Sequence, residues 1–156
     1  IKDTYHDTFG FRKIDNKISK HLGFFLNRFN FHISRSRVAY IFGYGEDPKP
    51  GAGWHVDEPV NQLLRINIPI QTSDEYAMQW NDKTYHLELG KAYLWNTRKP
   101  HRPAIIKKVK TKKPRINVVL GLTPWLHYDK QNDVYKKNKY FGTSIKQIVE
   151  NKLFVL

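Results

Sequence analysis

Short apolar runs alternate with polar turns along the middle of the chain. These runs are rich in β-branched and aromatic residues, and Gly, Pro, Asp and Asn separate them, which predicts antiparallel strands. The predicted strands are Val38–Phe42, Trp54–Asp57, Leu63–Ile70, Tyr76–Trp80, Thr84–Leu89, Ala92–Trp95, His101–Ile106 and Arg115–Leu122. Eight strands of this length favour a mainly β fold, a double-sheet jelly roll of the cupin kind.

The two ends of the chain have a different pattern. Apolar residues near helical spacing predict an N-terminal helix over roughly Asp15–Arg28. A final helix is predicted from about Ser144 to Asn151, with Ser144 as its N-cap. No repeat, low-complexity tract or linker divides the chain. We therefore expect a single domain over residues 1–156, with a jelly-roll core at about 38–123 and a helix flanking it at each end.

Two of the predicted strands carry polar residues on one face. In Leu63–Ile70 the side chains of Arg65 and Asn67 alternate with apolar ones, and in Arg115–Leu122 those of Arg115 and Asn117 do the same. In a simple sandwich such a face points to bulk water. In a small open barrel it lines a ligand cavity. The alternation by itself leaves both arrangements open.

The chain is strongly basic and has no cysteine. Lys and Arg number 27 against 14 Asp and Glu, a net charge of +13. Such a charge reflects a solvated lysine surface or attraction to acidic proteins or nucleic acid, and Lys107–Lys113, a predicted basic hairpin, is the candidate contact. The absence of cysteine excludes disulfides and thiolate metal sites, and it fits a cytoplasmic protein. No stretch approaches the roughly 18 apolar residues of a membrane helix, so no membrane partner is expected.

A metal-ligating pattern stands out in the strand region. His55 and Asp57 lie two apart, so on an extended strand both side chains leave the same face. His101, 44 positions after Asp57, is a third candidate ligand. Two imidazoles and one carboxylate form the facial triad that leaves open positions on Fe(II).

A second His-x-Asp pair occurs at His127-Tyr128-Asp129. No histidine follows it, so it has no third ligand downstream. We interpret this segment as a surface loop.

An arginine that could bind a carboxylate follows the third candidate ligand in the sequence. Arg115 comes 14 residues after His101 and opens a β-branched strand. Arginine stays charged and binds a carboxylate through two parallel hydrogen bonds, which suits the far carboxylate of an iron-chelating 2-oxoglutarate. Arg65, on the polar face of another predicted strand, is a candidate second carboxylate donor or substrate contact.

Residues Gly53–Leu122 resemble the aspartyl/asparaginyl β-hydroxylase-like branch of the 2-oxoglutarate oxygenases, which includes proline hydroxylases. The matching segments are His55-Val-Asp57, Leu64–Thr72, Tyr85–Asn96, Pro100-His101 and Arg115-Ile-Asn117. The resemblance implies a double-stranded β-helix fold. It also implies iron ligation by His55, Asp57 and His101.

The same resemblance implies the co-substrate site and the reaction. Arg115 would bind the C5 carboxylate of 2-oxoglutarate, Arg65 would assist it, and Asn96 would help to shape the site. The expected activity is hydroxylation of an amino-acid side chain in a protein, or of a free amino acid, with Fe(II) as cofactor and 2-oxoglutarate as co-substrate. The alternative is a non-catalytic jelly-roll module whose basic surface binds nucleic acid or acidic protein.

Overall fold

The computed structural model describes residues 20, 23, 33–43, 53–57, 63–110, 113–129 and 131–151. The predicted N-terminal helix, Asp15–Arg28, lies outside these residues apart from Lys20 and Gly23. Thr111 and Lys112 of the predicted basic hairpin also lie outside them.

The chain divides into two compact units. The first comprises Ile1–Ser36, Glu58–Arg65 and Leu120–Leu156, and the second comprises Arg37–Asp57 and Ile66–Val119. The candidate metal ligands, Asn96 and Arg115 all belong to the second unit, whereas Arg65 belongs to the first. The single domain predicted over residues 1–156 stays a prediction.

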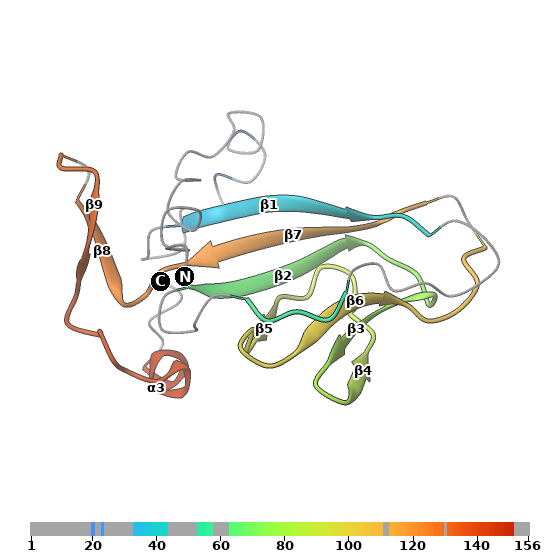
Figure 1. Cartoon of the computed structure of the whole chain (residues 1–156). Helices are drawn as coiled ribbons and strands as arrows, with labels where there is room; N and C mark the ends of the chain where they lie inside the picture. Colours follow the sequence, from blue (N-terminus) through green and yellow to red (C-terminus); the bar gives the residue numbers. More distant parts are fainter. Residues whose placement is uncertain are drawn as a thin grey trace. The chain divides into compact units, whose positions relative to one another are not determined.

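The described part of the chain is mainly β, with antiparallel sheets, and this confirms the predicted class. The elements are β1 (Ile33–Ile41), β2 (Leu64–Gln71), β3 (Tyr76–Trp80), β4 (Lys83–Tyr85), β5 (Tyr93–Trp95), β6 (His101–Ile105), β7 (Arg115–Leu122), β8 (Leu126–Asp129), β9 (Val134–Lys137) and α3 (Ile145–Glu150). Their sheet orders are β1-β7-β2-β5, β4-β3-β6 and β8-β9 (Figure 1).

Several predicted strands are found close to their expected bounds, and two are shorter. β3 and β7 have the predicted limits, β6 ends one residue earlier than predicted, and β2 begins and ends one residue later. The predicted strand Trp54–Asp57 is reduced to a single bridge at His55. The strand predicted at Thr84–Leu89 ends at Tyr85; residues 86–88 have no strand structure, and a turn follows in which the Lys91 amide donates to the Glu88 carbonyl.

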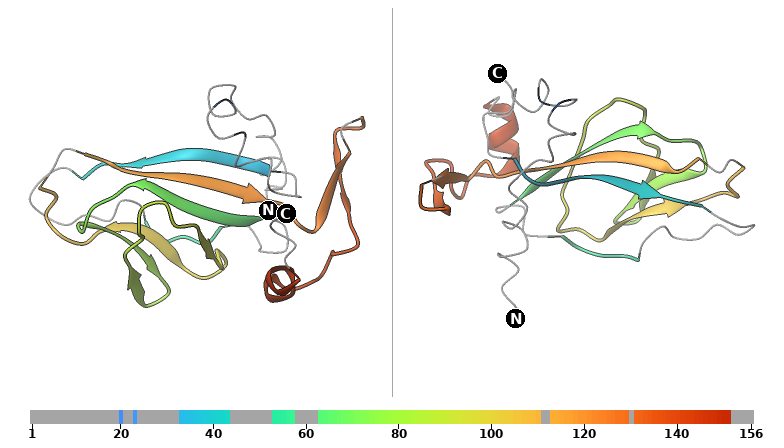
Figure 2. Two further views of the ribbon diagram at one scale, coloured as in Figure 1. Left: turned by 180° about the vertical axis from the view of Figure 1, so that it is seen from behind. Right: turned by 90° about the horizontal axis from the view of Figure 1, so that it is seen from above.

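The region after Pro124 differs from expectation. His127-Tyr128-Asp129 was predicted to be a surface loop, but it lies on β8, which pairs with β9 as a hairpin (Figure 2). The predicted C-terminal helix is confirmed as α3. Ser144 caps it, because its hydroxyl accepts from the Gln147 amide while the Gln147 side chain accepts from the Ser144 amide.

The polar face of β7 is buried. Arg115 is 1% exposed and Asn117 is 4% exposed, and Val118 and Leu120 on the opposite face are buried too. The Arg115 Nη1 group donates to the Ala77 carbonyl on β3 at 3.0 Å, so the side chain links the sheet of β7 to the sheet of β3. The sequence left open whether the face with Arg115 and Asn117 points to bulk water or into the interior. Their burial excludes the first arrangement.

The described residues of the basic segment, Lys107–Lys110 and Lys113, take no strand structure. Its base is nevertheless fixed, because the Tyr76 hydroxyl donates to the Lys113 carbonyl at 3.2 Å. Among the described residues no helix has the length and apolarity that crossing a membrane requires.

A close backbone approach at Gly43 provides a test of packing in the second unit. A Cβ built on Gly43 would overlap the Val109 side chain and lie 3.2 Å from Ile105 Cδ1. Because valine is short and rigid, we expect Gly43→Ala to lower the free energy of unfolding by about 1–3 kcal/mol. Urea denaturation measures this. Adding Val109→Ala should recover part of the loss, and a double variant no better than Gly43→Ala would contradict the proposed overlap.

Candidate metal centre

His55 and His101 are joined through their backbones. The His55 amide donates to the His101 carbonyl at 3.1 Å, and the His101 amide donates to the His55 carbonyl at 3.0 Å. Residues that exchange both hydrogen bonds in an antiparallel pair stand directly opposite each other, with their side chains on the same face. The two rings accordingly lie 4.5 Å apart between centroids.

Asp57 completes the group from the same strand-like segment. It lies two residues after His55 and therefore projects to the same face. Its amide donates to the Thr97 carbonyl at 2.9 Å, and its Oδ2 lies 3.3 Å from His101 Nε2. One ligand atom from each of His55, Asp57 and His101 falls within 4.8 Å of the other two, so one ion could contact all three.

Main-chain carbonyls orient both imidazoles. His55 Nδ1 lies 2.8 Å from the Gly53 carbonyl, and His101 Nδ1 lies 2.9 Å from the Lys99 carbonyl. A carbonyl only accepts, so Nδ1 carries the proton in each neutral ring and Nε2 keeps its lone pair. This is the arrangement in which a backbone acceptor fixes the tautomer of a metal-binding histidine.

Asn96 organises the turn that precedes His101. Its Oδ1 accepts from the Arg98 amide at 3.2 Å, and its carbonyl accepts from the Lys99 amide at 3.1 Å and from Trp80 Nε1 at 3.0 Å. The side chain is exposed. Asn96 thus organises the turn before His101, and its role in shaping a co-substrate site stays a prediction.

Arg115 is buried without full compensation of its charge. Nη1 has the Ala77 carbonyl as partner, but Nε and Nη2 have no hydrogen-bond partner among the described residues. Burial lowers the pKa of the guanidinium to about 10. Because a buried charge is costly unless paired, this side chain is suited to accept an anion.

The buried polar face offers further groups that sequence reasoning gave no role. Asn117 Oδ1 and Thr97 Oγ1 are buried and have no hydrogen-bond partner among the described residues. Asn117 lies two residues after Arg115 on the same face of β7. The alternation of polar and apolar residues in β7 predicted that Asn117 shares a face with Arg115. Nothing in the sequence marks Thr97 as a buried polar residue.

Strand pairing relates the arginine to the strand that carries His101. The hydrogen-bond acceptor of Arg115, Ala77, stands opposite Ala104 on β6, and Ala104 lies three residues after His101 on that strand. Arg115 and the three candidate ligands belong to the same unit.

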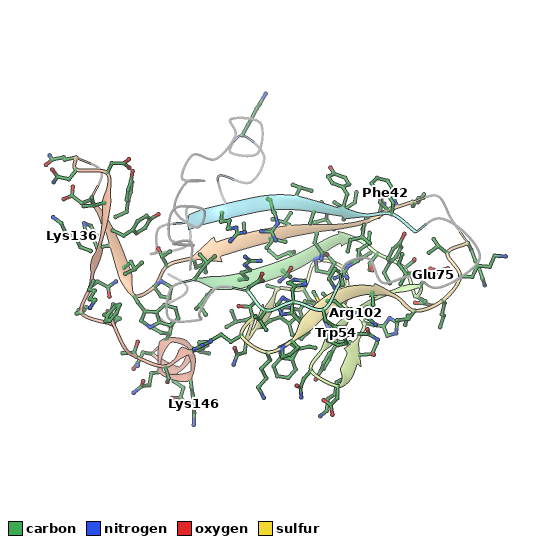
Figure 3. All side chains as sticks on the ribbon, viewed as in Figure 1. Phe42, Trp54, Glu75, Arg102, Lys136 and Lys146 are labelled. Atoms are coloured by element: carbon green, nitrogen blue, oxygen red, sulfur yellow. The ribbon has the colours of Figure 1, made fainter. Side chains whose placement is uncertain are left out.

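The positions of Arg65 and of two tryptophans do not by themselves assign these side chains a role. Arg65 on β2 is 5% exposed, and its assisting role stays a prediction. Trp54, next to His55, is 47% exposed and lies against Arg102, whose guanidinium carbon is 4.8 Å from the ring centroid (Figure 3). Trp80 stands opposite His101 in the β3–β6 register, so its ring is on the ligand face.

No protein-family model matches the chain, and a search of curated proteins finds no match either. The geometry and chemistry of these residues therefore carry the functional argument alone.

The buried charge of Arg115 predicts a stability effect. Its folded pKa lies below the unfolded value, so the charged side chain destabilises the fold below about pH 10, and the cost fades as the pH rises above that value. The fall corresponds to about 3 kcal/mol. We expect Arg115→Met to raise the ligand-free unfolding free energy by about 2 kcal/mol at pH 7. The matched Arg102→Met, at a half-exposed arginine, should not stabilise, and equal effects would contradict an uncompensated charge.

Proposed function

We propose that this chain is an Fe(II)- and 2-oxoglutarate-dependent hydroxylase with a double-stranded β-helix fold. Its substrate would be an amino-acid side chain in a protein or a free amino acid. The observation that carries the proposal is the grouping of His55, Asp57 and His101 in one unit with the buried, incompletely paired Arg115.

The donor set supports iron. Two imidazole nitrogens and one carboxylate, with no thiolate in the chain, match the facial arrangement that leaves positions open on Fe(II). The tautomers fixed by Gly53 and Lys99 direct Nε2 of both histidines toward the shared face. The residues present therefore fit this metal.

Arg115 supports 2-oxoglutarate as the co-substrate. A five-carbon dicarboxylate, with a metal–oxygen bond at one end and a hydrogen bond at the other, spans on the order of 10 Å. Arg115 donates to Ala77 on β3, which pairs with β6, the strand that begins at His101, so one such molecule could extend from the candidate ligands toward Arg115. In a non-catalytic module, by contrast, the buried charge of Arg115 would have no compensating function.

In this proposal each residue of the site has a distinct role. His55, Asp57 and His101 would hold the metal on one side and leave its other side to ligands. Arg115 would hold and orient the far carboxylate through Nε and Nη2, with Asn117 beside it. When bound, Fe(II) with 2-oxoglutarate supplies oxidative decarboxylation coupled to hydroxylation of a C–H bond. The protein's part is to bind, to orient and to limit access of water.

An anaerobic absorption titration tests the proposal. Adding Fe(II) and then 2-oxoglutarate to the full chain should produce a visible metal-to-ligand charge-transfer band. Asp57→Ala should lose this band and iron-dependent succinate formation while keeping its far-UV circular dichroism. If the folded, iron-loaded chain gives no band, the oxygenase assignment is wrong, and full activity in Asp57→Ala would overturn the triad.

The arginine anchor is tested separately by the co-substrate requirement. Because charge-assisted hydrogen bonds contribute about 1.5–3 kcal/mol, Arg115→Met should raise the 2-oxoglutarate concentration for half-maximal band intensity by about 10- to 100-fold. The iron affinity should stay unchanged, and Arg102→Met serves as the control. An unchanged 2-oxoglutarate requirement would place the anchor elsewhere, with Arg65 the next residue to test.

A further inference from the structure

The proposed hydroxylase site makes no use of the hairpin β8–β9 or of the turn that follows it. The segment Tyr135–Phe141 reads Tyr-Lys-Lys-Asn-Lys-Tyr-Phe, with three lysines, three aromatic residues and no acid. We call it the basic-aromatic segment. It belongs wholly to the first unit. Cations interleaved with rings on one element are the usual composition of a nucleic-acid surface.

The two acidic residues of the hairpin engage one lysine of this segment, Lys136, and one tyrosine outside it. Asp129 and Asp133 lie at the turn between the strands, where Asp129 pairs with Lys136 at 2.8 Å and Asp133 accepts from the Tyr128 hydroxyl. The ion pair and hydrogen bonds from Asn132 lower the pKa of Asp129, so it stays ionised and paired. Lys137 stands at the other end of the hairpin, opposite Leu126.

The lysines that remain lie against aromatic rings. Lys137 Nζ is 4.4 Å from the Phe141 ring centroid, and Lys139 Nζ is 5.0 Å from that of Tyr140. Both lysines are exposed, and Phe141 is 42% exposed. In the register of β8 and β9, Lys137 shares a face with Tyr128 and Tyr135, whose rings lie 5.0 Å apart (Figure 3 labels the neighbouring Lys136).

The turn that presents these side chains is firmly held. The Asn138 amide donates to the Trp125 carbonyl at 3.1 Å, and its Nδ2 donates to the Pro124 carbonyl at 2.9 Å. The indole of Trp125, 1% exposed, donates to the Thr143 carbonyl at 2.8 Å. A surface fixed before binding loses little conformational entropy when it binds.

We propose that the basic-aromatic segment binds single-stranded nucleic acid. Lys137 and Lys139 contact backbone phosphates, and Phe141 and Tyr135 stack on bases. The net charge of +13 adds a long-range attraction of the same sign. An acidic protein would pair with the lysines but offer no flat partner to the exposed ring of Phe141. This binding requires neither iron nor 2-oxoglutarate, so it stands independently of the proposed hydroxylase.

The test is fluorescence anisotropy of a labelled twelve-nucleotide oligouridine with the metal-free full chain over a series of salt concentrations. For single strands the slope of log affinity against log salt is about −0.7 per phosphate contact. Lys137→Gln with Lys139→Gln should therefore reduce the slope by about 1.4. Phe141→Leu should weaken binding about tenfold at an unchanged slope.

The control removes the same charge elsewhere, by Lys91→Gln with Lys146→Gln, two exposed lysines paired to Glu88 and Glu150. This pair should leave the slope unchanged, and circular dichroism should show all variants folded. Equal slope changes in both double variants would mean diffuse attraction and overturn the proposal. Absence of oligouridine binding at low salt would overturn it too, as would tighter binding of polyglutamate, which would indicate an acidic protein partner.

Discussion

The reciprocal backbone hydrogen bonds between His55 and His101 are the interaction on which the candidate metal centre depends. They place the two imidazoles on one face, and the two-residue period of extended backbone then places Asp57 on that face. The segment that carries His55 is not a full strand. A single paired residue is enough, because the Asp57 amide makes a second attachment at Thr97.

Burial of the charged Arg115 side chain is the second feature that shapes the site, and it lowers the free energy of unfolding. A guanidinium that is 1% exposed and has two donor groups without a partner among the described residues raises the energy of the ligand-free fold. Proteins retain such strain where a ligand relieves it. The basic-aromatic segment is arranged differently, since Lys137 and Lys139 are exposed and hydrogen bonds from Asn138 hold its turn.

The sequence allowed most of this arrangement to be predicted, for identifiable reasons. Period-two alternation and turn residues located β2, β3, β6 and β7, and the same period placed His55 and Asp57 on one face. Alternation could not show whether Arg115 and Asn117 face solvent, because that depends on which sheet covers β7. The hairpin β8–β9 was missed because each strand is only four residues long, too short for alternation to stand out, and three of the four residues of β9 are exposed.

The turn at residues 96–99 makes hydrogen bonds to two of the candidate ligands. The Thr97 carbonyl accepts from the Asp57 amide, and the Lys99 carbonyl accepts from His101 Nδ1. Asn96 stabilises the turn, because its Oδ1 accepts from the Arg98 amide. The chain should therefore tolerate insertions and deletions very unevenly. One residue added between Asn96 and His101 would displace both attachments together, whereas the exposed basic segment near Lys107 can change length without moving either. Related chains that keep the three candidate ligands should be constant in length at the first place and variable at the second.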